Sequence, residues 1–213
     1  SSAWTAALTF SLITSGGYAE STEGKYPWTY VNQTAARQAC EQHPTGRKHL
    51  CTSNEWMAAS NINGQTYNLP ATLSNCTIDE STDCDWTDAP GSGDACLTGS
   101  KTNCKSAELV YDMTGNLWEW ANETITVTIP PAGGNSWYYI NTTSQQYTVN
   151  NSAADNGRYG KDGTYFGTAG VRGVLRGGGW HYGISAGPFC AYLGNAPSAT
   201  GYPVGFRCCA APN

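Results

Sequence analysis

This sequence has few charged residues, few histidines and no long apolar run. Lys, Arg, Asp and Glu make up only 13% of the 213 residues, and the net charge is −5. A disordered chain would carry more charge and fewer aromatic residues than the 12% found here. The acidic balance and the lack of a basic stripe argue against nucleic acid as a partner. Because no apolar run reaches about 18 residues, we expect no membrane insertion of this stretch of chain.

Cysteine is abundant, whereas zinc-site patterns are missing. The chain has nine Cys and three His, and none of the cysteines forms a CxxC pair. So many cysteines are typical of a disulfide-bonded protein in an oxidising compartment, so we expect a secreted or cell-surface protein. Four cysteines at short spacings lie in the irregular polar segment 62–109. Local disulfides Cys76–Cys84 and Cys96–Cys104 would hold such a long loop in place.

The length predicts one domain over residues 1–213. Apolar alternation predicts a strand at 7–13. A helix is expected at 34–42, and a second helix begins at a capping box formed by Thr52 and Glu55. Residues 121–170 are interpreted as a mostly polar insertion with a β-like patch at 137–140.

The C-terminal stretch 174–209 has two anchored ends and a loop-like middle. Three glycines at 177–179 allow positive φ or close backbone approach, and Trp180 and Phe206 are apolar anchors. Between them, aromatic and hydroxyl residues alternate with Gly and Pro, which is typical of binding loops. The predicted ligand-binding residues are His181, Tyr182, Ile184, Phe189, Tyr192, Ser198, Thr200 and Tyr202.

After Trp180 the chain contains no Lys, Glu, Gln, Met or Trp. These types form roughly one residue in seven of the chain, so about four would be expected between residues 181 and 213. They are also the five amino acids that cannot arise when the first two bases of Asn codons ending in a pyrimidine are randomised. The alternative is that a Gly- and Pro-rich, disulfide-tied loop simply lacks long polar side chains.

Four segments in order resemble the formylglycine-generating-enzyme-type domain, also known as the sulfatase-modifying-factor type. They are YPWTYV (26–31) leading to AARQAC (35–40), GRKHLCTSNEW (46–56), residues 111–120 with GNLWEW, and LRGGGW (175–180) with GFRC (205–208). The resemblance implies an α+β, C-type lectin-like fold, loop-rich and disulfide-stabilised, with small antiparallel sheets and two helices. With the restricted composition after Trp180, the chain is similar to variable proteins of diversity-generating retroelements.

The resemblance also implies specific pairs and ligands. The cysteine of the family's GFRC motif pairs with one on the first helix, which implies Cys40–Cys208 and makes Cys51–Cys209 the neighbouring bridge. In the family, calcium is held at the positions of Asp112, Gly115, Leu117 and Glu119, so a structural Ca²⁺ is one expectation. The alternative is that Glu119 forms a local cap or salt bridge and binds no metal.

Enzymatic members of this family use two active-site thiols that bind copper. Cys190 falls near the second, but Ser185 stands five residues earlier, so one thiol remains and no copper is expected. We therefore predict a non-catalytic protein that binds a protein or cell-surface ligand through its C-terminal stretch. The alternatives are an oxidoreductase of the formylglycine-generating type with altered thiols, and a calcium-dependent lectin.

Overall fold

The computed structural model describes residues 17–60, 76–78, 95–106, 109–128, 136–141, 146–149, 163–201 and 203–210. For 136–141, 146–149 and Ile184 it describes the backbone only. The strand predicted at 7–13 and the residues Cys84 and Tyr202 lie outside these ranges. Within them, no helix has the length and apolar character needed to cross a bilayer.

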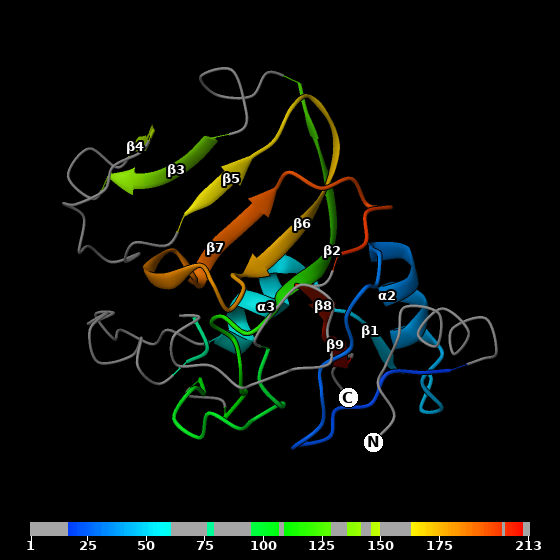
Figure 1. Cartoon of the computed structure of the whole chain (residues 1–213). Helices are drawn as coiled ribbons and strands as arrows, with labels where there is room; N and C mark the ends of the chain where they lie inside the picture. The colour runs from blue at the N-terminus through cyan, green and yellow to red at the C-terminus, as the bar shows by residue number, and fades with distance from the viewer. Residues whose placement is uncertain are drawn as a thin grey trace.

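A mixed sheet of seven strands forms the centre of the fold (Figure 1). Its order across the sheet is β4 (Gln146–Val149), β3 (Ser136–Asn141), β5 (Thr164–Phe166), β7 (Gly187–Leu193), β6 (Gly170–Gly177), β2 (Trp118–Val127) and β8 (Val204–Phe206). The β5–β7 and β2–β8 pairs are parallel, and the other neighbours are antiparallel. One sheet is therefore larger and more mixed than the small antiparallel sheets expected from the sequence.

The segment 121–170 is less irregular than its polar composition predicts. It contains the second half of β2 together with β3, β4 and β5, and the β-like patch at 137–140 lies within β3. The end of β2 reads TITV, and β-branched side chains favour strands whether or not they are apolar. Polarity alone was therefore a poor guide to structure at this position.

Both predicted helices are present, each with its own N-terminal cap. α2 (Gln33–Glu41) begins after Asn32, whose side chain accepts a hydrogen bond from the main-chain N–H of Ala35 at 2.8 Å. α3 (Ser53–Ser60) begins with the predicted capping box. The main-chain N–H of Thr52 donates to Glu55 Oε2 at 2.8 Å, and the N–H of Glu55 donates to Thr52 Oγ1 at 3.2 Å.

The main core lies between α2 and the β2–β6 part of the sheet. Small residues on α2 let the helix approach Trp120, which is fully buried and donates its indole N–H to Val31 O at 2.8 Å. Gly173 on β6 is required opposite this ring, because a Cβ there would lie 2.5 Å from it. Leu50, Leu175 and Val204 complete the same cluster.

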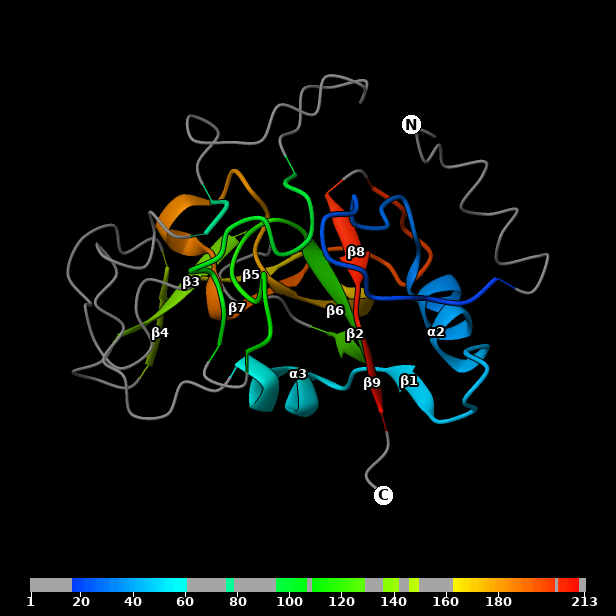
Figure 2. The ribbon, with the colours of Figure 1, turned by 90° about the horizontal axis from the view of Figure 1, so that it is seen from below.

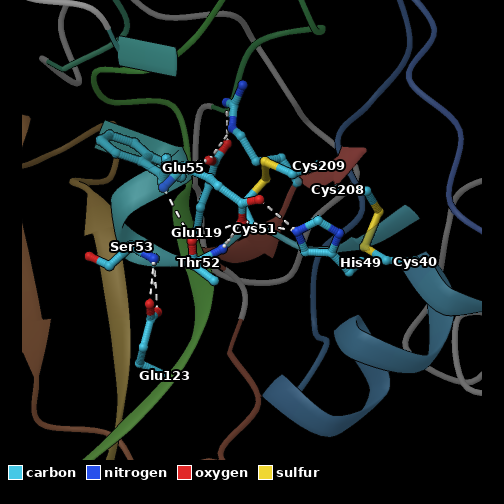
Figure 3. The surroundings of a disulfide bond; sticks show 12 residues. Cys40, His49, Cys51, Thr52, Ser53, Glu55, Glu119, Glu123, Cys208 and Cys209 are labelled. Atoms are coloured by element: carbon cyan, nitrogen blue, oxygen red, sulfur yellow. Dashed lines mark hydrogen bonds and ion pairs between the residues drawn. A yellow bond between two sulfur atoms is a disulfide. The ribbon is translucent and has the colours of Figure 1, made fainter. Parts of the chain in front are cut away.

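Two disulfides bind residues 208–209 to α2 and to the segment that precedes α3 (Figure 3). Cys208 at the start of β9 (Cys208–Ala210) joins Cys40 on α2, and Cys209 joins Cys51 after β1 (Lys48–Leu50). Both expected pairs are confirmed. β9 pairs antiparallel with β1, and Figure 2 shows this pair beside α3. A disulfide that closes a loop of 168 residues lowers the entropy of the unfolded chain, which is worth roughly 5 kcal/mol on the chain-entropy account.

The two predicted local disulfides are wrong. Cys76 pairs with Cys104, and Cys96 is bonded to a different cysteine from the one predicted. The Cys76–Cys104 bond joins residues 76–78 to the segment 95–106. Both segments also bond to the turn 109–117, because the N–H of Asn116 donates to Thr77 O at 2.7 Å and the N–H of Asp112 donates to Cys104 O at 3.0 Å. The side chain of Asn116 accepts and donates hydrogen bonds with the main chain of Cys96. Short sequence spacing favoured local pairs, but the folded turn brings these distant cysteines together.

Candidate ligand-binding site

The C-terminal stretch leaves β6 through a turn that only glycine allows. Gly177 and Gly178 have φ angles of 88° and 86°, and a Cβ on Gly178 would lie 2.5 Å from the Cβ of Ala186. Trp180 follows, 5% exposed, and packs in a cluster with Leu117. The role of Trp180 as an anchor is therefore confirmed.

The other end of the stretch is held by Phe206 and by strand pairing. Phe206 packs against Trp28 with ring centroids 5.4 Å apart. On β8, Val204 and Phe206 lie opposite Trp118 and Trp120 of β2 in a parallel ladder. The two ends of the stretch are thus fixed on the same strand of the main sheet, as β6 also pairs with β2.

The loop between β7 and β8 is held through its main-chain carbonyls. The oxygens of Asn195, Pro197, Gly201 and Pro203 each accept a hydrogen bond from a main-chain N–H elsewhere in the fold, at 2.8–3.2 Å. The donors are Gly173, Gln33, Tyr30 and Trp118 respectively. Every amino acid, including proline, supplies a main-chain carbonyl. These four bonds therefore do not depend on which side chains the loop carries.

Most predicted ligand-binding residues reach solvent. His181, Ser198 and Thr200 are exposed, whereas Tyr182, Phe189 and Tyr192 are half-buried. On β7 the neighbours Cys190, Ala191 and Leu193 are buried, so Phe189 and Tyr192 are partly exposed positions on an otherwise buried strand. The side chain of Ile184, in the short 3₁₀ helix Gly183–Ser185, is not described, and Tyr202 lies outside the described residues.

A pocket of about 130 Å³ opens where this stretch meets β2 and β6. It brings together three predicted residues, His181, Tyr182 and Tyr192, whereas Phe189, Ser198 and Thr200 do not line it. Sequence reasoning missed the rest of the lining, which is Trp118, Leu175, Asn195, Pro203 and Val204. Asn195 could have been found from its place in the same loop, but the β2–β8 register that places Trp118 beside Val204 has no sequence signal.

The aromatic side chains at the pocket support one another. The ring of Trp118 lies 4.8 Å from that of Tyr182, edge to face, and 5.5 Å from that of Tyr192. Tyr192 stacks on Tyr165 of β5, with centroids 4.5 Å apart and planes at 6°. Burial raises the pKa of Tyr182, and burial together with the nearby Tyr165 raises the pKa of Tyr192. Both hydroxyls are therefore uncharged at neutral pH.

The sequence matches a known protein family. The sequence profile of the sulfatase-modifying factor enzyme 1-like domain matches residues 11–212. The chain belongs to this family. The resemblance carried by the four ordered motifs is therefore confirmed, and the name describes the domain rather than its activity.

Solved structures similar to this chain include one that is named a variable protein. Treponema denticola variable protein 1 aligns with a TM-score of 0.52 at 17% identity, over 92% of this chain and 75% of that one. The P3c and M1 variants of Major Tropism Determinant align with TM-scores of 0.46 and 0.44, both at 20% identity and over 84% of this chain. The chain spans 37% of the length of either variant. No curated protein matches the sequence.

The residues predicted to bind calcium include Glu119, which forms an ion pair with Arg207. The carboxylate of Glu119 accepts from Nε and Nη2 of Arg207, and its Oε2 also accepts from the indole N–H of Trp56 at 2.7 Å. Asp112 Oδ2 accepts the N–H of Gly99 at 2.9 Å, and burial raises the pKa of Asp112. A calcium ion would have to displace a guanidinium from Glu119, so as arranged these residues fit the salt-bridge alternative better. Calcium binding by Asp112, Gly115, Leu117 and Glu119 stays a prediction.

Proposed function

We propose that this protein is a non-catalytic display protein, whose C-terminal stretch 181–204 binds a protein or cell-surface ligand and tolerates sequence change there. The main-chain anchoring of the loop 194–203 carries the proposal. Because the fold holds that loop by its carbonyls, its side chains can be exchanged without loss of these bonds. The disulfides at Cys208 and Cys209 fix the end of the stretch covalently.

Exposure and composition support the same function. The predicted binding residues that the structure describes with their side chains are exposed or half-buried, so their exchange should cost little stability. The stretch contains only amino acids reachable from randomised Asn codons. A relative of the same fold is a variable protein by name. Disulfides indicate an oxidising compartment, which agrees with a secreted or cell-surface protein.

Two libraries would test tolerance directly. The first randomises His181, Tyr182, Tyr192, Ser198 and Thr200, and the matched control library randomises buried positions of the same stretch, Ala186, Cys190, Leu193 and Val204. Each library is displayed on yeast and treated with protease. We expect a several-fold larger share of protease-resistant members in the first library, since core substitutions cost about 1–5 kcal/mol each. Equal shares would contradict the proposal.

The nucleotide sequence offers a second, independent test. A variable protein of a diversity-generating retroelement should have a nearly identical downstream repeat that differs only at adenines, next to a reverse transcriptase gene. Absence of both in the complete genome would remove the diversification part of the proposal and leave ligand binding as a separate question.

The oxidoreductase alternative depends on Cys190. This residue keeps its thiol, is fully buried on β7, and has Ser185 rather than a second cysteine five residues before it. A Cu(I) titration checks the alternative. Tight binding that is lost in Cys190→Ser would support the enzyme, and we expect no such binding.

A further inference from the structure

The pocket beside β2 combines a fixed floor with exchangeable walls. Trp118 and Leu175 belong to β2 and β6 and are 3% and 1% exposed, so the fold holds them in place. Tyr182 and Tyr192 come from the stretch proposed to bind ligand. The pocket therefore has a part that sequence change in the stretch would leave intact, and a part that such change would reshape.

Contacts within the fold hold the aromatic walls of the pocket in place. Trp118 packs against both tyrosine rings, and Tyr165 stacks on the outer side of Tyr192. Gly194 leaves room for this arrangement, because a Cβ there would lie 2.6–2.7 Å from the ring and hydroxyl of Tyr192. Rings held in this way lose little conformational freedom on binding, which favours affinity.

The lining combines apolar faces with several polar groups. Six of its eight residues are aromatic or aliphatic, and none is Lys, Arg, Asp or Glu. Polar groups are limited to the tyrosine hydroxyls, His181 and Asn195. An anion needs a cation in the lining, and none of the lining residues is Lys or Arg.

Arg172 places a positive charge near one wall of the pocket. Arg172 lies close enough for its charge to affect the titration of Tyr192, and its Nη1 donates to Gly194 O at 3.1 Å. Its Nε and Nη2 donate to oxygens of Thr168 and Ala169 at 2.6–3.1 Å. A guanidinium in this position repels a second cation. The N–H groups of Arg172 already donate to oxygens of the protein.

We propose that this pocket receives one uncharged aromatic side chain from a protein ligand. The volume of about 130 Å³ fits one ring, since a cavity of about 150 Å³ in another protein binds benzene. Burial of a single anchor side chain in a rigid aromatic pocket is the usual arrangement of an interface hot spot. This inference rests on the proposed display function and specifies the kind of ligand.

A titration with small probes tests the chemistry of the pocket. The probes are p-cresol, tetramethylammonium and methyl glucoside. Binding of each probe is monitored by NMR, through the main-chain signals of ¹⁵N-labelled protein and the ring signals of its tyrosines. We expect saturable shifts at Trp118, Tyr182 and Tyr192 with p-cresol, and binding at least about tenfold weaker with the other two. Equal or tighter binding of tetramethylammonium or the glucoside would overturn the proposal.

Matched variants show whether binding occurs in this pocket. Asn195→Trp should fill the pocket and abolish the p-cresol shifts, whereas Ser198→Trp, on the same loop but outside the lining, should not. Both substitutions keep the carbonyl bonds of the loop, and thermal unfolding verifies the fold. If Asn195→Trp unfolds, His181→Trp at an exposed rim position replaces it. Binding that survives the blocking variant would place it elsewhere and refute the assignment.

A final comparison separates a protein ligand from a free small molecule. N-acetyltyrosine amide carries the same ring on a peptide backbone, and we expect it to bind at least as tightly as p-cresol. Binding of p-cresol alone would exclude a protein side chain. If no probe shifts the pocket signals, the pocket proposal is wrong while the display function stands or falls with the two libraries.

Discussion

Replacing Glu119 by Gln should destabilise the protein more than the same kind of change, Glu to Gln or Asp to Asn, at any other acidic residue that the structure describes. Glu119 is 8% exposed, and its carboxylate is shared between the guanidinium of Arg207 and the indole N–H of Trp56. Arg207 has two further acceptors, the main-chain oxygens of Tyr111 and Asp112, at 3.3 and 3.4 Å. The substitution keeps the shape of the side chain but removes the carboxylate in direct contact with the guanidinium, which leaves only the more distant charge of Asp112.

The magnitude follows from the burial of the pair. Removal of one partner of a buried ion pair costs about 3–5 kcal/mol. The side chains of Arg207 and Glu119 are 19% and 10% exposed, so we expect the lower end, about 3 kcal/mol. For a chain of this size about 1 kcal/mol shifts Tm by roughly 2–4 °C, which gives a decrease of about 6–12 °C. Glu41→Gln, at an exposed position on α2, is the matched control and should change stability by less than about 0.5 kcal/mol.

The assay is thermal and urea unfolding of the oxidised protein, in excess calcium chloride and in excess EDTA. If the ion pair is responsible, Glu119→Gln lowers Tm equally in both buffers, and the wild-type protein is indifferent to calcium. If Glu119 is a calcium ligand, calcium raises the Tm of the wild-type protein and this gain is lost in the variant. The second result would refute the ion-pair reasoning and restore the calcium site, and a Tm change no larger than that of Glu41→Gln would refute both.

Three further substitutions or treatments test local features. In Glu55, burial raises the pKa, but hydrogen bonds from Thr52 and His49 together with the charge of His49 outweigh it, so the pKa is lowered. The stability advantage over Glu55→Gln should therefore be complete above the unfolded pKa of about 4.3 and fade as pH falls through the folded pKa. A pH-independent difference in urea midpoint would contradict this. Gly194→Ala should displace the ring of Tyr192 and weaken p-cresol binding, with near-wild-type affinity as the contrary result. Iodoacetamide should modify Cys190 in urea but not in the native protein, and mass spectrometry showing native alkylation would contradict its burial.

Local sequence signals predicted local structure well. The capping box at Thr52 and Glu55 and the helix at Gln33–Glu41 follow from side-chain chemistry within one turn, so the sequence was sufficient. The family resemblance supplied the long-range pair Cys40–Cys208. The pair Cys76–Cys104 depends on how the turn 109–117 folds back, which neither spacing nor resemblance contains.

The candidate site was predicted only in part for the same reason. Its exchangeable residues stand in one stretch of chain and carry a compositional signal, so His181, Tyr182 and Tyr192 were found. The pocket exists because a parallel pairing sets Val204 beside Trp118 across a long sequence separation. Strand register of this kind is decided by the packing of the whole sheet, and no local pattern reports it.

Three consecutive residues of β2 link the stability of the fold to the site. Trp118 supports the tyrosine rings of the pocket, Glu119 holds Arg207 on the opposite face of the strand, and Trp120 fills the core. Each of them also lies opposite a residue of β8, which ends the proposed binding stretch. Changes in the stretch should therefore alter binding with little effect on β2, whereas a change in β2 should disturb folding and binding together. Trp118→Phe is the informative case. If the variant loses affinity for the ligand while the stretch 181–204 stays resistant to protease, the indole ring of Trp118 orients the tyrosines rather than merely filling space.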